Sequence, residues 1–221
     1  MERQVIAVRH GESAANAAFA IADRTGVEPT GLPPRDADVV LTETGRRQSL
    51  ALGRWLAGLP SGERPQVIRS SVFVRARATA ELISEAFTPA PPLSLDERLR
   101  DRDMGAFELL TAGAIRRRFP QESARRDRVG DLFYRPPGGE SLADVGIRVR
   151  GVLAELDDHR TLIVAHDAVV LMLRYVLEGL SEDDLRSVVR DDPVRNSSVT
   201  RWRRRGDRWE LLDYNRLDHL G

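Results

Sequence analysis

The stretch Val5-Ile6-Ala7-Val8-Arg9-His10-Gly11-Glu12-Ser13 decides the fold that this sequence predicts. Four apolar residues lead directly into Arg9-His10-Gly11, and a short apolar run that ends at a turn signal is typical of a buried parallel strand. Ser13 is a suitable N-cap for the Ala-rich helix that follows. We therefore expect His10 in the loop between the carboxyl end of a strand and the start of a helix, where open α/β sheets bind their ligands.

An anion is the ligand that this loop favours. The unpaired backbone N–H groups at the start of a helix attract negative charge, and Arg9 offers a forked guanidinium group that suits phosphate. A histidine held beside such a site can attack phosphorus as a nucleophile. A lone histidine after a strand is more often structural, however, so His10 alone does not establish catalysis.

The same arrangement recurs near the other end of the chain. Thr161-Leu162-Ile163-Val164-Ala165 is again an apolar strand that ends at a histidine, His166, and the sequence 168–173 predicts a buried helix. Two of only four histidines thus follow strands in separate βα units. Since parallel strands place their carboxyl ends along one edge of a sheet, we expect both histidines at that edge.

The composition limits the classes of function. The chain has 221 residues, a length typical of one large α/β domain, and 34 basic residues balance 34 acidic ones. A net charge of zero argues against a protein that mainly coats nucleic acid or an anionic membrane. Cysteine and lysine are both absent, which excludes thiolate metal sites, cysteine nucleophiles, Walker A lysines and Schiff-base lysines. With no apolar stretch of membrane-spanning length and no signal-peptide pattern, a cytoplasmic protein is expected.

The middle of the chain predicts further βα units. Thr42 or Thr44 is expected to cap a second helix, Val67-Ile68 is expected to form a short strand, and Val72–Ile83 predicts a helix with Arg75 near its start. The remaining segments are interpreted as a surface loop (26–38), a Pro-rich linker (89–95), a helix (109–119), a helix that Ser141 caps (to about 156) and an edge hairpin with a Gly206-Asp207 turn. Residues 100–140 are interpreted as an insertion over the edge of the sheet.

With these motifs identified, the chain resembles the histidine phosphatase superfamily over nearly its whole length. Arg9-His10-Gly11-Glu12-Ser13 with Asn16 resembles the opening signature of the family, and Leu41-Thr42-Glu43-Thr44-Gly45-Arg46 resembles its second-helix motif. Ser71 to Ala80, Gly138-Gly139-Glu140-Ser141 and Val164-Ala165-His166 are similar to the remaining motifs. The middle of the chain is most similar to the fructose-2,6-bisphosphatase branch. The tryptophan-rich sequence usual in glycolytic mutases is missing, which ranks a phosphatase above a mutase.

The resemblance implies an α/β fold, a three-layer αβα sandwich with a mostly parallel central sheet, in a single domain over residues 1–221. It also implies a metal-independent phosphomonoesterase that needs no cofactor and acts on a small phosphorylated metabolite. His10 would become phosphohistidine, and Arg9, Arg75 and His166 would hold the phosphoryl group with help from Asn16. The neutral His10 ring should donate its other N–H to a backbone carbonyl.

The general acid departs from the family pattern. Asp101 stands where the family usually has glutamate, and aspartate is one methylene shorter. We expect Asp101 to protonate the leaving group, with Glu108 and Glu140 as alternatives. Arg126 is a candidate contact for a second phosphate or a sugar.

Four other interpretations stay open. A mutase would retain the phosphohistidine and return the phosphoryl group, and a silent relative would bind a phosphate ligand without turnover. A metal hydrolase built on His10 and His166 would lose activity in a chelator, and an Arg-rich RNA binder would bind in a salt-sensitive way. Neither nucleic acid nor a membrane is an expected partner. A homodimer is possible, through the edge hairpin or the helix that carries Trp55.

Overall fold

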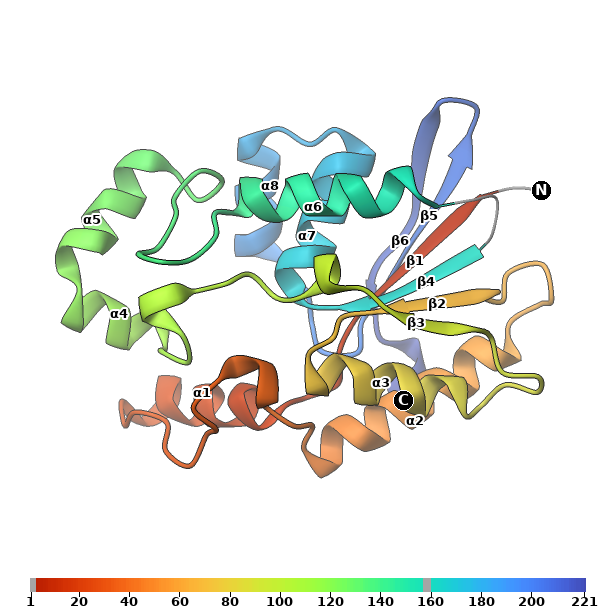
Figure 1. Cartoon of the computed structure of the whole chain (residues 1–221), viewed down its shortest axis with the longest axis horizontal. Coiled ribbons are helices and arrows are strands. Elements are labelled where there is room, and N and C mark those ends of the chain that lie inside the picture. Colours follow the sequence, from red (N-terminus) through yellow and green to blue (C-terminus); the bar gives the residue numbers. More distant parts are fainter. Residues whose placement is uncertain (1–2, 157–159) are drawn as a thin grey trace.

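The computed structural model describes residues 3–156 and 160–221, and its centre is one six-stranded sheet with the order β3-β2-β4-β1-β5-β6 (Figure 1). The strands are β1 (Gln4–Arg9), β2 (Val67–Ser70), β3 (Leu93–Leu95), β4 (Arg160–Ala165), β5 (Val199–Arg205) and β6 (Arg208–Arg216). The first four strands in the sheet order run parallel, whereas β5 and β6 are antiparallel to their neighbours. The predicted mostly parallel sheet is confirmed.

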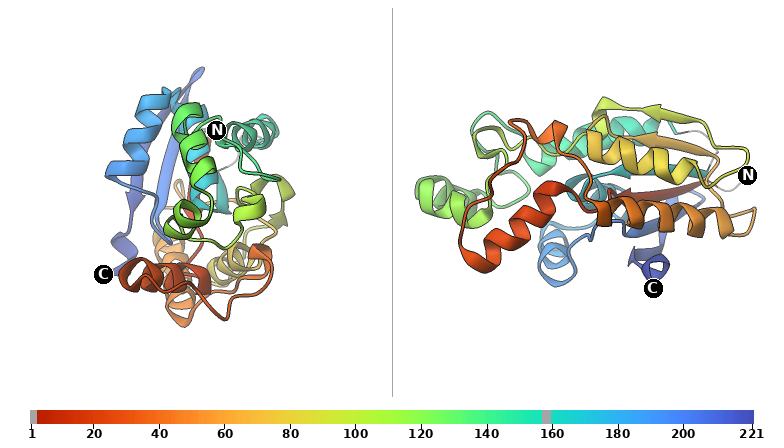
Figure 2. Two further views of the ribbon diagram at one scale, coloured as in Figure 1. Left: turned by 90° about the vertical axis from the view of Figure 1, so that its left-hand side faces the viewer. Right: turned by 90° about the horizontal axis from the view of Figure 1, so that it is seen from below.

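Helices cover both faces of this sheet (Figures 1 and 2). They are α1 (Ala14–Thr25), α2 (Glu43–Gly58), α3 (Val74–Ser84), α4 (Ala112–Arg118), α5 (Pro120–Val129), α6 (Leu142–Ala154), α7 (Asp167–Glu178) and α8 (Glu182–Asp191). One core cluster joins the sheet to α6 and α7, and a second joins it to α2 and α3. The α/β fold with three layers is therefore confirmed. No helix in the described ranges is long and apolar enough to cross a membrane.

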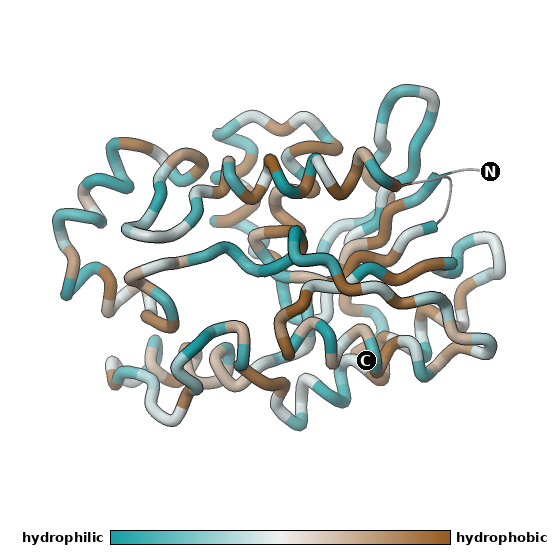
Figure 3. The backbone as a smooth tube through the Cα atoms, viewed as in Figure 1, coloured by the Kyte–Doolittle hydropathy of each residue, from teal (hydrophilic) through white to brown (hydrophobic). Residues whose placement is uncertain are grey.

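The alternation of side chains along the central strands explains the two cores. Val5 and Ala7 of β1 pack in the cluster with α7, whereas Ile6 and Val8 pack in the cluster with α2 and α3. Because successive side chains of a strand point to opposite faces, a strand buried on both faces must be apolar throughout. The central strands are accordingly hydrophobic along their length (Figure 3).

The register of β1 and β4 brings the two predicted histidines together. Arg9 pairs with Ala165 across the parallel ladder, so the next residue on each strand is a histidine. The backbone N–H of His10 donates to the Ala165 carbonyl at 2.9 Å. The two imidazole rings then lie edge to face with their centroids 5.1 Å apart. The expected juxtaposition at one sheet edge is confirmed.

Two local expectations need correction, and two further helices are present. The segment interpreted as a Pro-rich linker ends in β3, which adds to the sheet beside β2. The helix expected over 109–119 begins only at Ala112, because Leu109 adopts a left-handed backbone with a φ of 57°. A separate helix, α5, starts at Pro120, where proline is favoured because the first helical N–H has no partner. The helix α8 was not predicted.

The expected helix caps are present. The Ser13 and Ser141 side chains accept hydrogen bonds from the third residues of α1 and α6, and Thr42, not Thr44, caps α2. The insertion carries α4 and α5 beyond the carboxyl edge of the sheet (Figure 1). It contributes Met104, Leu132 and other side chains to the cavity described below, and so covers the site as expected.

Candidate active site

His10 occupies the centre of the candidate site and is buried, with 2% of its surface exposed. Its Nδ1 lies 2.7 Å from the carbonyl oxygen of Gly11, which only accepts hydrogen bonds, so Nδ1 carries the ring proton. Its Nε2 accepts a hydrogen bond from Arg75 Nε at 3.1 Å, and so presents a lone pair. This matches the tautomer expected of a nucleophile. Burial, followed by the nearby Arg75 charge, holds the pKa of His10 well below its usual value, and the ring is neutral.

Arg75, at the start of α3, is almost completely buried, and each nitrogen of its guanidinium group donates a hydrogen bond. Besides the bond to His10, Nη1 donates to the Asp36 carbonyl at 2.6 Å. Nη2 donates to the carboxylates of Asp36 at 2.8 Å and Asp101 at 2.9 Å. The carboxylates of Asp36 and Asp101 thus bind Arg75, the side chain that the resemblance predicts to bind phosphate. A phosphoryl group that binds Arg75 Nη2 would compete with these carboxylates.

Asp101 lies between Arg75 and His166. Its Oδ2 is 3.3 Å from His166 Nδ1, and its Oδ1 accepts from the Arg102 backbone N–H at 2.8 Å. Burial raises the pKa of Asp101, but attraction to His166 and to the Arg75 guanidinium outweighs burial and holds that pKa well below its usual value. The carboxylate is therefore ionised while the site holds no phosphate.

His166 is completely buried and lies behind the cavity rather than on its wall. Its Nε2 is 2.9 Å from the Ser71 hydroxyl, and its ring packs edge to face on Phe73 with 5.2 Å between centroids. Burial lowers the pKa of His166, although Asp101 opposes the shift. The other six predicted site residues line the cavity, which leaves His166 as the exception.

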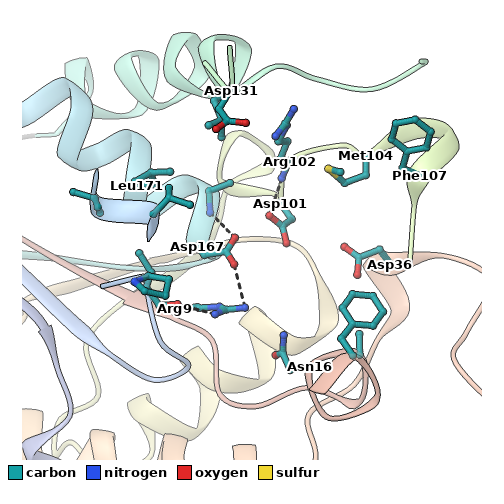
Figure 4. Close-up of a pocket in the computed structure, with 18 of the residues that line it drawn as sticks. Arg9, Asn16, Asp36, Asp101, Arg102, Met104, Phe107, Asp131, Asp167 and Leu171 are labelled. Carbon is teal, nitrogen blue, oxygen red and sulfur yellow. Dashed lines mark hydrogen bonds and ion pairs between the residues drawn. The ribbon is translucent and has the colours of Figure 1, made fainter. Parts of the chain in front are cut away.

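Arg9 and Asn16 line the same cavity, and different residues position them. Arg9 donates to the Val194 carbonyl at 2.7 Å and pairs with Asp167 at 3.1 Å (Figure 4). The Asn16 Oδ1 accepts from the Asn196 side-chain amide at 3.0 Å, so its own amide group is free to act as a donor. Asn16 thus has a donor available for an anion, as its predicted role requires.

The three remaining candidates lie farther from His10 or are already engaged. Arg126 lines the cavity and pairs with Asp131 at 2.6 Å. Glu108 accepts from the Asp36 backbone N–H and does not line this cavity. Glu140 binds two arginines, Arg100 and Arg148, and also lies outside it. Among the three carboxylates considered as the acid, only Asp101 is placed beside the nucleophile.

The cavity that joins these residues has a volume of about 460 Å³, within the range of pockets that hold small molecules. Figure 4 shows Arg9 and Asn16 toward one end, Asp131 toward the other, and Leu171 and Phe107 on opposite sides. In the described part of the chain, no group of three or more His, Asp or Glu residues could hold a metal ion.

Two residues of this site were missed from the sequence. Asp36 lies in a segment interpreted as a surface loop, and the only signal was its position among Gly, Pro and Asp residues. Asn196 donates to the His10 carbonyl at 3.1 Å although the two residues are far apart in sequence. Nothing in the sequence around Asn196 indicates this contact.

Comparisons with known proteins agree with the geometry. The family model of the histidine phosphatase superfamily (branch 1) matches residues 5–217. A 2,3-bisphosphoglycerate-dependent phosphoglycerate mutase of Beijerinckia indica is 32% identical over 195 residues, which cover 85% of this chain and 87% of the relative.

Solved structures give the same assignment. A mycobacterial hydrolase superimposes with a TM-score of 0.79 at 26% identity, covering 98% of this chain and 99% of that protein. A mycobacterial glucosyl-3-phosphoglycerate phosphatase in complex with VO3 gives a TM-score of 0.76 at 27% identity, with 96% and 99% covered. The chain therefore belongs to branch 1 of the histidine phosphatase superfamily, and the predicted histidine phosphatase enzyme is confirmed.

Proposed function

We propose that this chain is a metal-independent phosphomonoesterase that hydrolyses a small phosphorylated metabolite through a phosphohistidine. The observation that supports it most strongly is the neutral His10, whose Nε2 lone pair is held beside Arg75 in the cavity. Attack by Nε2 forms an N–P bond while the bond from phosphorus to the ester oxygen breaks. Arg9, Arg75 and Asn16 stabilise the charge on the phosphoryl oxygens, and His166 supports the site from behind.

Asp101 supplies the proton to the leaving oxygen in this proposal. An ionised Asp101 must first gain a proton, and substrate binding provides the cause. A phosphate dianion that takes over Arg75 removes an attraction that keeps the Asp101 pKa low, and its negative charge raises that pKa further. In the second step, Asp101 accepts a proton from the attacking water, the N–P bond breaks, and inorganic phosphate leaves.

The test compares two esters in EDTA. For 4-nitrophenyl phosphate, whose leaving group needs no proton, we expect turnover by the wild type and by Asp101→Asn but not by His10→Ala. For an alkyl phosphate, Asp101→Asn should lose about 10²–10⁴-fold in kcat/KM. Asp103→Asn, in the same segment, is the matched control and should behave as the wild type. Turnover by His10→Ala, or its loss in EDTA, would contradict the mechanism.

A mutase is the second candidate, because relatives such as that of Beijerinckia indica are named as phosphoglycerate mutases. It predicts isomerisation of phosphoglycerate that depends on 2,3-bisphosphoglycerate. Similarity to the fructose-2,6-bisphosphatase branch stays a hypothesis. Arg126 as a contact for the leaving group, a cytoplasmic location and a homodimer are further parts of the proposal.

A further inference from the structure

The part of the cavity beyond the catalytic residues is mostly apolar. Met104, Phe107 and Leu110 of the insertion line one side, and Leu171 of α7 and Leu185 of α8 contribute to the rest. Leu171 and Phe107 face each other across the space between Arg9 and Asp131 (Figure 4). A sugar or glycerate leaving group would place its hydroxyl and carboxylate groups against these side chains. Such groups lose free energy when they are buried without hydrogen-bond partners.

The charges on the cavity wall are balanced. Five arginines and five carboxylates line it, and four of the arginines are paired within it: Arg9 with Asp167, Arg75 with Asp36 and Asp101, Arg126 with Asp131, and Arg186 with Glu182. The fifth, Arg102, donates to two backbone carbonyls. The pairs Arg126–Asp131 and Arg186–Glu182 both have N–O distances of 2.6 Å.

A second phosphate or carboxylate on the substrate would meet a carboxylate beside each of these outer arginines, Asp131 beside Arg126 and Glu182 beside Arg186. Arg126 and Arg186 each donate a hydrogen bond to a carboxylate, and Arg102 donates to a backbone carbonyl. Every arginine of the outer cavity therefore has a hydrogen-bond partner among the described residues. The wall therefore offers apolar contact and balanced charge rather than a second anion site.

We infer that the substrates of this enzyme are monophosphate esters whose leaving group has an extended apolar part, a chain or ring system of about six or more carbons. The inference rests on the proposed phosphatase function and names the substrate class of that site. The phosphoryl group lies at His10, and the apolar part fills the space between Phe107 and Leu171. Burial of each methylene should improve kcat/KM up to about fourfold.

The first experiment measures hydrolysis of n-butyl, n-hexyl and n-octyl phosphate below their micellar concentrations. The leaving alcohols have nearly equal acidity, so differences in kcat/KM report on contact with the chain. We expect a rise of at least tenfold from butyl to octyl, and 3-phosphoglycerate should be poorer than hexyl phosphate. A flat series, or a preference for 3-phosphoglycerate or a bisphosphate, would overturn the inference.

The second experiment separates binding from catalysis. The n-alkylphosphonates lack the ester oxygen and cannot be hydrolysed, so calorimetry with the butyl and octyl compounds measures affinity alone. Tighter binding of octylphosphonate without turnover of any ester would refute the phosphatase proposal and keep the ligand class. Turnover of esters with equal binding of both phosphonates would keep the phosphatase proposal and refute the apolar ligand class.

Two variants locate the effect. Met104→Gln and Leu110→Gln replace cavity-wall side chains by a polar one and should reduce the octyl-to-butyl ratio at least threefold. Ile147→Gln changes an equally apolar residue that is 71% exposed and lies outside the cavity, and should keep the ratio of the wild type. If circular dichroism shows that both wall variants fold and their octyl-to-butyl ratio is unchanged, the alkyl chain of the substrate does not lie against these side chains.

Discussion

Asp36 competes with the substrate for Arg75. Its carboxylate accepts from Arg75 Nη2, while its backbone carbonyl accepts from Nη1. Burial raises the pKa of Asp36, although Arg75 opposes the shift. A phosphate that bound Arg75 Nη2 would therefore compete with the Asp36 carboxylate.

Asp36→Asn should strengthen competitive inhibition by inorganic phosphate about three- to tenfold, since the variant keeps the backbone contact and removes the competing charge. The measurement is the inhibition constant of inorganic phosphate, determined with any ester that the enzyme hydrolyses. Asp38→Asn, an exposed residue of the same short helical turn, is the control and should not change the constant. A weaker inhibition in Asp36→Asn would mean that Asp36 instead helps to hold the phosphate.

His10 should make the stability of the protein depend on pH. Its folded pKa lies well below the value of about 6.5 for an unfolded histidine, so the unfolded chain binds a proton that the folded chain does not. Stability is thus present above pH 6.5 and is lost as the pH falls below it, by up to about 1.4 kcal/mol per pH unit.

The prediction compares the wild type with His10→Asn, which cannot titrate there. Urea unfolding at pH 7.5, 6.5 and 5.5 should show a steeper loss for the wild type. His166, whose pKa is also lowered, is present in both proteins. Parallel profiles would show that His10 titrates normally.

The central residues of the site could be predicted because the strands that precede them determine their positions. His10 and His166 each follow an apolar strand, and a parallel ladder brings such positions together without further information. Asp36 and Asn196 could not be predicted in the same way. Each lies in a loop whose path depends on packing against distant segments, and a hydrogen bond such as that from Asn196 to the His10 carbonyl has no periodic signal.

The loop after β1 and the helix α2 approach each other closely through two glycines. A Cβ built on Gly45 would lie 2.0 Å from the Glu12 carbonyl oxygen, and one on Gly11 would lie 2.4 Å from the Gly45 oxygen. Both clashes involve backbone atoms, which cannot be relieved by a change of side-chain rotamer. This contact sets the position of the loop that carries His10.

Gly45→Ala should therefore lower the free energy of unfolding by about 1–3 kcal/mol and reduce kcat, because the His10 loop must shift. Denaturant unfolding and steady-state kinetics measure the two effects. Gly58→Ala in the same helix has nothing within 4 Å of its Cβ and should be neutral or slightly stabilising. Equal behaviour of the two variants would refute the role of the close approach.

The elements that the sequence failed to predict have physical reasons. Strand β3 has only three residues and a mostly exposed edge position, so no alternation marks it. Helix α5 begins at a proline that was interpreted only as the end of the preceding helix. Helix α8 carried a clear signal, a Ser181 cap with Asp184 three residues later and acidic residues in its first turn. This helix contributes Leu185 and other residues to the cavity wall.

Two segments that lie far apart in the sequence meet beside His10. The Asn196 amide donates to the His10 carbonyl and to Asn16 Oδ1, and the Val194 carbonyl accepts from Arg9. The segment 193–197 thus holds the loop between β1 and α1 from the side opposite α2. The geometry of the site consequently depends on residues that are almost the whole chain apart.

Asn196→Ala should destabilise the protein by about 1 kcal/mol and raise KM more than it lowers kcat, because Asn16 loses one of the partners that orient it and keeps its bonds to Ser13. Thermal unfolding and steady-state kinetics report the two parts. Arg190→Ala, at an exposed position on α8 whose side chain bonds Asp191 and Ser187 of the same helix, should change neither. A pure loss of stability with unchanged KM would show that Asn196 supports the fold alone.

Strand β1 is synthesised before both of its partners, β4 and β5, which lie about 150 residues or more farther along the chain. While synthesis is under way, its four apolar residues have no sheet to join and are exposed to aggregation. Closing such long loops also makes folding slow. A nascent chain halted before residue 160 would therefore carry His10 without the strands that bury it, and the candidate site can form only after β4 and β5 have been made.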